Sequence, residues 1–164
     1  MNHRILVAGI GNIFLGDDAF GVEAVRRLAS SELPDGVKVV DFGIRAYDLA
    51  FELMNPWALT ILVDALPRGG RPGTLYVMEP EIPQGVDQEA LDAHSMNPVA
   101  VLKLVGALGG KIGRLLVVGC EPATVEANAD GNIGLSPPVE AALEDTIRII
   151  QGLVAGMSSH RMAA

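Results

Sequence analysis

The amino-acid sequence predicts a three-layer α/β fold, in which helices cover both faces of a twisted, mostly parallel β-sheet. Short apolar runs without polar alternation recur along the chain, for example residues 4–10 (RILVAGI), and this pattern is typical of strands buried on both faces. Segments with apolar residues at three- or four-residue spacing lie between these runs, as expected for helices that pack one side on a sheet. Apolar residues make up 49% of the chain and aromatic residues only 4%, which suits a core of aliphatic side chains.

Five strands are expected, and four of them should run parallel. The run at residues 74–78 follows the third strand after a loop of Pro, Arg and Gly residues, which is too short for the helical crossover that parallel strands need. This strand is therefore predicted to pair antiparallel at an edge of the sheet. The expected strands are residues 4–10, 37–42, 59–66, 74–78 and 115–119.

Helix-start and helix-stop residues delimit four helices. Asp17 and Asp18 can cap the first helix, since acidic side chains at a helix start accept hydrogen bonds from its free N–H groups. Ser136 can serve as the N-cap of the last helix, with Pro137 at its first position. The expected helices are residues 19–31, 46–54, 98–108 and 137–154, and residues 155–164 are expected to form a flexible tail.

Length and composition limit the class of protein. A chain of 164 residues is expected to form a single domain over residues 1–164, ordered over about residues 4–154. No apolar run reaches the roughly 18 residues of a membrane helix, and the N-terminus resembles no signal peptide, so we expect a cytoplasmic protein without membrane contact. The net charge of −8 disfavours binding to nucleic acid. The single Cys120 cannot form an internal disulfide, which fits a reducing compartment.

Candidate functional residues follow from the place of polar side chains in the expected sheet. Ligands of open α/β sheets bind outside the carboxyl ends of the parallel strands. Asp64 is the most informative residue, because it lies among apolar neighbours at the end of a buried strand, where an unpaired charge is costly. The polar residues expected at this rim are Asn12, Asp17, Asp18, Asp41, Asp64, His94, Cys120 and Glu121.

Three of these residues, Asp18, Asp64 and His94, would together make a metal site. Two carboxylates and one imidazole with open positions suit a borderline divalent metal such as nickel or zinc. Each residue also has a structural alternative that stays open. Asp64 could cap a neighbouring loop, Asp18 could complement a helix dipole, and His94 could be a solvated loop residue.

Other kinds of site fit the sequence less well. Cys120 closes a buried strand, and no second histidine on the rim would activate it, so a core position is predicted rather than a nucleophile. Two glycines after the first strand and Asp41 after the second imitate a dinucleotide-binding fold. The glycine spacing is wrong for that fold, however, and the two acidic residues at the helix start would repel a pyrophosphate. No organic cofactor is therefore expected.

Residues 9–21 (GIGNIFLGDDAFG) resemble the opening signature of the hydrogenase maturation endopeptidases, the family that processes the large subunits of nickel-iron hydrogenases. The resemblance continues through Val63-Asp64-Ala65, His94 and residues 134–137 (GLSP), and it covers about residues 4–154. It implies a twisted, mostly parallel five-stranded sheet of the phosphorylase/hydrolase-like type, with helices on both faces.

The resemblance also implies roles for individual residues. Asp18, Asp64 and His94 match the positions of the family's catalytic and metal-binding residues, and they are the same three residues that the rim position selects. The family often has Glu at the position of Asp18. This chain therefore keeps a carboxylate there on an arm that is one methylene shorter.

One segment departs from the family pattern. After the second strand the family usually shows Asp-x-Gly-Thr-x-Gly, whereas this chain has residues 41–47 (DFGIRAY). Asp41 and Gly43 match, but the Thr and the second Gly do not. Arg45 of this segment could bind a carboxylate or carbonyl group of a substrate, or it could be a solvated loop arginine. Because the segment is expected to recognise the substrate, its departure concerns the hydrogenase subtype more than the reaction.

The resemblance implies an endopeptidase that removes the C-terminal extension of a nickel-loaded large-subunit precursor of a nickel-iron hydrogenase, acting as a monomer. Nickel would be supplied by the substrate and recognised by Asp18, Asp64 and His94, with water activated by the metal or by a carboxylate. An acidic rim favours the approach of a cationic centre. A nickel-binding or chaperone-like maturation factor without peptidase activity is the alternative, because the same residues would serve it.

Overall fold

A computed structural model describes residues 4–82, 98–127 and 133–159 and confirms the predicted α/β fold. Strands and helices alternate along most of the chain, as the pattern of apolar runs predicts. Within the described ranges the elements are β1 (Ile5–Ile10), the 3-10 helix η1 (Gly16–Ala19), α1 (Phe20–Leu28), β2 (Val37–Gly43), α2 (Ala46–Leu53), β3 (Leu59–Ala65), β4 (Leu75–Met78), α3 (Pro98–Ala107), β5 (Arg114–Cys120) and α4 (Pro137–Ser159).

The strands form one sheet with the order β2-β1-β3-β5-β4. β1 pairs in parallel with β2 and with β3, and β3 pairs in parallel with β5. β4 runs antiparallel to β5 at the edge, with Leu75 opposite Cys120. The predicted antiparallel edge strand is confirmed, because the connection from β3 contains no helix that would carry the chain back to the start of the sheet.

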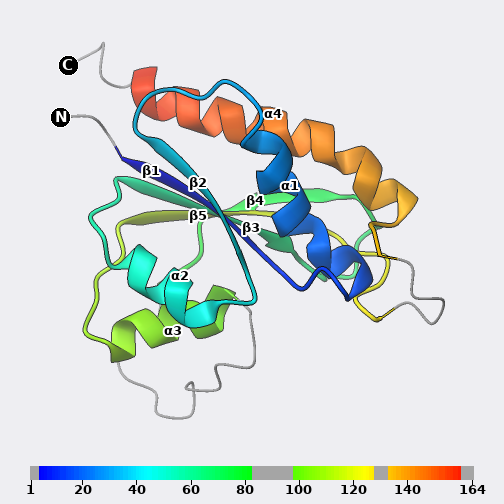
Figure 1. The fold of residues 1–164 in the computed structure, drawn as a ribbon, viewed down its shortest axis with the longest axis horizontal. Helices are drawn as coiled ribbons and strands as arrows, with labels where there is room; N and C mark the ends of the chain where they lie inside the picture. The colour runs from blue at the N-terminus through cyan, green and yellow to red at the C-terminus, as the bar shows by residue number, and fades with distance from the viewer. Residues whose placement is uncertain (1–3, 83–97, 128–132, 160–164) are drawn as a thin grey trace.

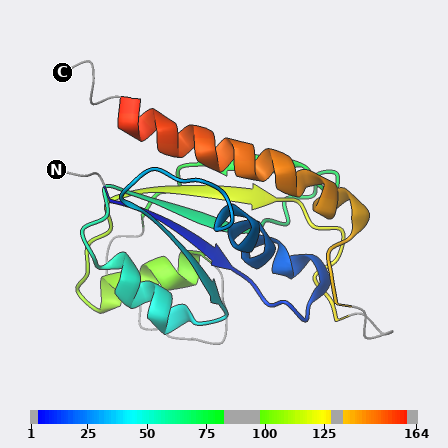
Figure 2. The same cartoon turned by 45° about the horizontal axis from the view of Figure 1, so that its top comes forward.

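Helices cover both faces of the sheet and complete the three predicted layers (Figure 1). α1 and α4 pack on one face, and α2 and α3 pack on the other, as Figure 2 also shows. Side chains of β1 alternate between the two cores. Ile5 and Val7 belong to the α1/α4 core, whereas Leu6 and Ala8 belong to the α2/α3 core. Burial on both faces explains why this strand is apolar without alternation.

Helix α1 lies very close to the sheet at Gly21. A Cβ atom at this residue would lie 2.1 Å from the backbone oxygen of Val63 and 2.4 Å from that of Ile10. Gly9 of β1 is equally restricted, because a Cβ atom there would lie 2.3 Å from the backbone oxygen of Gly21. Only glycine permits such an approach of two backbones. The first turn of α1, and η1 before it, are thereby held against the carboxyl ends of β1 and β3.

The start of the first helix differs from the prediction. Asp17 and Asp18 lie in η1, and α1 begins after Ala19, an N-cap residue without a side-chain cap hydrogen bond. The expectation that the two acidic residues cap this helix is therefore wrong. The physical reason is that both carboxylates accept hydrogen bonds from other segments, Asp17 from Ser136 and Asp18 from Asn12.

The last helix is longer than predicted. α4 runs to Ser159 instead of about residue 154, so residues 155–159 are helical rather than a flexible tail, and residues 160–164 lie outside the described ranges. Over the described ranges no helix, α4 included, is long and apolar enough to cross a lipid bilayer. The helix continues because apolar residues keep helical spacing and pack on the α1/α4 core, namely Ile150, Val154 and Met157.

We predict that Gly21→Ala destabilises the protein by about 2 kcal/mol or more, because the added methyl group must displace the backbone of β1 or β3. Gly152→Ala in α4 is the matched control, since a Cβ atom there meets nothing within 4 Å beyond its own helix. This variant should keep the native stability or gain about 0.5–1 kcal/mol from helix propensity. Urea unfolding followed by circular dichroism measures both variants. A Gly21→Ala protein as stable as the native one would contradict the close backbone contact.

Candidate functional site

The candidate site lies at the carboxyl ends of β1 and β3. From β1 the chain passes through α1 to β2 on one side, and from β2 it passes through α2 to β3 on the other side of β1. α1 and α2 lie on opposite faces, so the ends of β1 and β3 form a topological switch point, where open α/β sheets bind ligands. Asp18 lies in η1, which follows β1, and Asp64 lies at the carboxyl end of β3. Asp18 lies near enough to Asp64 for its charge to act on the Asp64 carboxyl group.

Asp64 is a buried acid at the end of a buried strand. Asp64 is only 5% exposed, and it lies opposite Gly119 of β5. Burial raises the pKa of its carboxyl group well above the usual value, and the negative charge of Asp18 raises it further, while a hydrogen bond from the backbone N–H of Ala65 lowers it. The sequence argument that a partner must compensate this buried charge stays a prediction. Such a carboxyl group favours a bound proton or a cation.

Asp18 completes an acidic pair with Asp64. Its Oδ2 atom accepts a hydrogen bond of 2.8 Å from the backbone N–H of Asn12, and its own N–H donates to the carbonyl of Leu15. The β1–α1 loop is also tight at Gly11, where a Cβ atom would lie 1.8 Å from the backbone oxygen of Asp18. The described residues form no salt bridge with either acid of the pair. The arrangement can therefore attract a divalent cation with two carboxylate groups.

Asp17, the neighbour of Asp18, has a structural role that the sequence did not reveal. It is fully buried, and its carboxylate accepts hydrogen bonds from the N–H groups of Ala123, Thr124 and Ser136 and from the Ser136 hydroxyl, at 2.7–3.3 Å. Ser136 occupies the predicted position before α4, but its hydroxyl donates to Asp17. These bonds join η1 to the connection between β5 and α4. Asp18 is thereby held at a defined place beside the sheet.

His94, the third residue of the predicted site, lies outside the described residues. The prediction that it joins Asp18 and Asp64 is therefore untested. Within the ranges that the structure describes, no group of three His, Cys, Asp or Glu residues could hold a metal ion. The three-ligand site of Asp18, Asp64 and His94 therefore stays a prediction.

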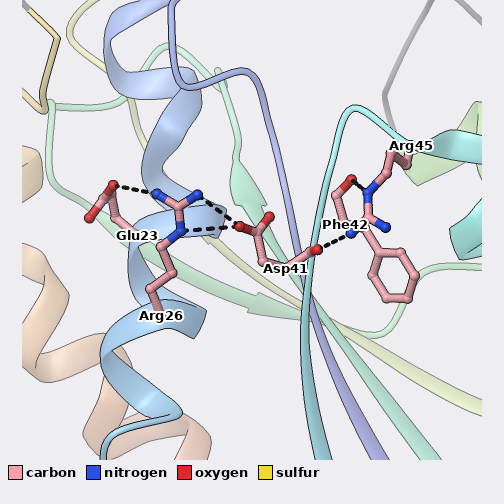
Figure 3. Close-up of polar contacts among 5 residues, drawn as sticks. All are labelled: Glu23, Arg26, Asp41, Phe42 and Arg45. Carbon is pink, nitrogen blue, oxygen red and sulfur yellow. Dashed lines mark hydrogen bonds and ion pairs between the residues drawn. The ribbon is translucent and has the colours of Figure 1, made fainter.

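The segment predicted to recognise the substrate makes extensive contacts within the protein (Figure 3). The Asp41 carboxylate binds Arg26 of α1, with 3.0 Å between Oδ2 and Nη2. Arg45 donates to the carbonyl oxygens of Asp41 and Phe42, the latter at 3.2 Å, which ties its side chain to its own turn. Gly43 adopts a φ of +54° and accepts a hydrogen bond from the N–H of Gly11 through its carbonyl. Recognition of a substrate by Asp41, Gly43 and Arg45 stays a prediction.

Cys120 is part of the core, as predicted. The residue is fully buried beside the α1/α4 core. Burial raises the pKa of its thiol to about 11, and the nearby charge of Asp17 adds to this effect. The thiolate, which is the reactive form of cysteine, is therefore scarce at neutral pH. This residue is a poor candidate for a nucleophile.

Glu121, the last residue of the predicted rim, anchors the loop that follows β3. Its carboxylate accepts hydrogen bonds from the N–H groups of Arg68 and Gly69 and from the Tyr76 hydroxyl. Burial raises the pKa of Glu121, but these donors lower it more, so that its pKa lies below the usual value. Hydrogen-bond donors thus stabilise the charge of Glu121, whereas burial and the charge of Asp18 raise the pKa of Asp64.

We predict that Asp64→Asn is more stable than the native protein at neutral pH in a buffer with a metal chelator, by on the order of 1 kcal/mol. A carboxyl group whose pKa is raised on folding contributes stability below its unfolded pKa, and this contribution is lost as the pH rises through the folded pKa. The gain of Asp64→Asn should therefore disappear toward about pH 4, the ordinary pKa of aspartate. Urea unfolding over this pH range measures the difference, and a less stable Asp64→Asn protein at neutral pH would contradict it.

Asp17→Asn is the matched control for this measurement and should have the opposite effect. The amide group of asparagine cannot accept all four hydrogen bonds that the Asp17 carboxylate accepts. We expect a loss of about 2 kcal/mol or more at neutral pH, because hydrogen bonds to a buried charged group are among the stronger ones. Opposite signs of the stability change at the two positions would separate a buried acid held by four hydrogen bonds from one whose pKa is raised by burial.

Comparisons with known proteins show which proteins this chain is similar to. The model of the HycI family, described as hydrogenase maturation protease, matches residues 22–153. The hydrogenase 2 maturation protease of Escherichia coli K12 is 32% identical over 145 residues, which cover 88% of this chain and 86% of that protein. The hydrogenase expression/formation protein HupD of Rhizobium leguminosarum bv. viciae is 34% identical over 154 residues, which cover 90% of this chain and 74% of that protein.

Solved structures with the same fold carry related names. The hydrogenase maturating endopeptidase HybD from Escherichia coli aligns with a TM-score of 0.72 at 28% identity, over 94% of this chain and 93% of its own. A hydrogenase 2 maturation peptidase from a Thaumarchaeota archaeon aligns with a TM-score of 0.70 at 29% identity, over 93% and 98%. On the strength of the family model, the sequence relatives and the shared fold, this chain belongs to the hydrogenase maturation protease family and is a hydrolase of the endopeptidase class.

Proposed function

We propose that this protein removes the C-terminal extension from the nickel-loaded large-subunit precursor of a nickel-iron hydrogenase. We further propose that Asp18, Asp64 and His94 recognise the nickel ion that the substrate carries. The observation that supports this proposal most is the pair of Asp18 and Asp64 at the switch point, in a chain of the hydrogenase maturation protease family. The names of the relatives associate those proteins with the maturation of hydrogenases.

The chemistry of the pair favours a cationic substrate. Two carboxylates that raise each other's energy are stabilised when a divalent cation lies between them, and the imidazole of His94 would add a nitrogen ligand suited to nickel. In this proposal the ion belongs to the substrate, so its arrival would bring the scissile peptide bond to the site. The attacking water would be activated by the ion or by a carboxylate acting as general base, which gives either a metal-dependent or an aspartic-type mechanism.

The place of action and the oligomeric state follow as further parts of the proposal. The single cysteine is buried in the core, so that the fold depends on packing without a disulfide, and a reducing cytoplasm would suit it. The monomer is the form in which a large protein substrate has free access to the ends of β1 and β3.

Incubation with a nickel-loaded large-subunit precursor tests the function. We expect the native protein to release a C-terminal peptide that mass spectrometry detects, and we expect Asp18→Asn, Asp64→Asn and His94→Ala each to slow this release by about 100-fold or more. Cys120→Ser is the control and should process the precursor at the native rate, since the buried thiol takes no part.

Each result decides a separate part of the proposal. If the native protein binds the nickel-loaded precursor but releases no peptide, it is a maturation factor without peptidase activity. Full activity of one of the three variants would remove that residue from the site. A folded but inactive Cys120→Ser protein would restore the thiol as a candidate nucleophile.

A further inference from the structure

Several of the chain's few aromatic residues are exposed to solvent. The sequence has one Trp, two Tyr and four Phe, and among these Phe14 is 64% exposed, Phe51 58% and Tyr47 48%. Ile44 is 60% exposed. Large apolar side chains that gather on a protein surface are typical of sites that bind another protein. We refer to Phe14, Ile44, Tyr47 and Phe51 as the apolar strip.

Three residues of the apolar strip follow one another along the β2–α2 turn and α2, and the fourth lies in a loop that is hydrogen-bonded to β2. Tyr47 and Phe51 are four residues apart in α2 and therefore share one face of this helix, and Ile44 precedes them in the β2–α2 turn. Phe14 lies in the β1–α1 loop, which is joined to this turn by the hydrogen bond from Gly11 N–H to the Gly43 carbonyl. Figures 1 and 2 both show the β2–α2 turn beside the loop that follows β1.

The strip begins in the loop that carries the acidic pair, and this loop is ordered by hydrogen bonds. The Asn12 side chain accepts a bond of 2.9 Å from the N–H of Phe14, and the Asn12 N–H donates to the carboxylate of Asp18. Asn12 thus binds both the backbone of Phe14 and the carboxylate of Asp18. A surface that is ordered before binding loses little conformational entropy when a partner covers it.

The chemistry of the family identifies the partner. A protease acts on a polypeptide, and the loop that carries Phe14 also binds Asp18 through the N–H of Asn12. A second copy of this chain on the strip would cover the same loop and obstruct access to the acidic pair, so a homodimer through this surface is disfavoured. The occupant with matching chemistry is a protein with an apolar surface next to its bound cation.

We propose that the apolar strip docks the folded body of the substrate protein, while the acidic pair receives the cation that this protein carries. The identity of the cation rests on the proposed function. Docking distant from the reacting bond contributes to substrate binding more than to the chemical step, because it acts equally before and during the reaction. Exposed aromatic anchors of this kind carry much of the binding energy of protein interfaces.

The test compares Tyr47→Ser/Phe51→Ser with the native protein on a nickel-loaded large-subunit precursor. These residues are in α2, so their replacement leaves the loop of Asp18 intact. We expect the KM for the precursor to rise about tenfold or more and kcat to change by less than about twofold. Val77→Ser is the matched control, because Val77 is 48% exposed, as is Tyr47, but lies in β4 at the opposite edge of the sheet. Its KM should equal the native value.

The outcomes separate the docking surface from the proposed function. If the native protein cleaves the precursor and the double variant has the native KM, or if Val77→Ser raises the KM as much, the docking surface is wrong and the function stands. If the native protein does not cleave, the dissociation constant for the same precursor is compared by surface plasmon resonance. If only the double variant binds the precursor more weakly than the native protein, and Val77→Ser does not, the docking surface is supported. If the double variant binds as tightly as the native protein, the docking surface is overturned. A native dimer that the double variant converts to a monomer would show that a second copy occupies the strip.

Discussion

The close contact of α1 with the carboxyl ends of β1 and β3 determines the geometry of the rest of the site. At Gly21 the helix backbone lies so near the backbone oxygens of Ile10 and Val63 that no side chain fits between them. This contact places η1, which directly precedes α1, beside the end of β3. Asp18 of η1 therefore meets Asp64, although the two residues are far apart in the chain. A helix held farther from the sheet would separate the two carboxylates.

Two adjacent acids of the same loop have opposite roles because their surroundings differ. Asp17 is buried among four hydrogen-bond donors and joins η1 to the connection before α4. Asp18 accepts one hydrogen bond within the described residues and lies near the buried Asp64, and its charge raises the pKa of Asp64. The hydrogen bonds of Asp17 thus hold in place a loop whose next residue, Asp18, is electrostatically unfavourable beside Asp64. A local cost in folding stability of this kind is typical of functional residues before a ligand binds.

In the proposed function, the acidic pair and the apolar strip would divide recognition of the substrate between two kinds of interaction. Paired carboxylates attract a cation strongly but carry little information about the polypeptide around it. An exposed apolar surface contributes affinity and shape, which a charged pair alone cannot supply. Asn12 links the two, since its side chain orders the loop at Phe14 and its backbone binds Asp18. The proposed selectivity for one protein, rather than for peptides in general, would need both kinds of interaction.

The sequence by itself determined the five strands, their mostly parallel arrangement and the antiparallel edge strand, because buried strands and short connections leave local patterns of apolar residues and turns. It also singled out Asp64, since an acid in an apolar run is visible without a structure. Only the tertiary structure decided that Asp17 binds the connection before α4 instead of capping a helix. It also decided that α4 continues to Ser159. The hydrogen bonds between Asp17 and Ser136 join residues 119 positions apart. Side-chain contacts over such a separation leave no periodic signal in the sequence, because they depend on how the whole chain packs.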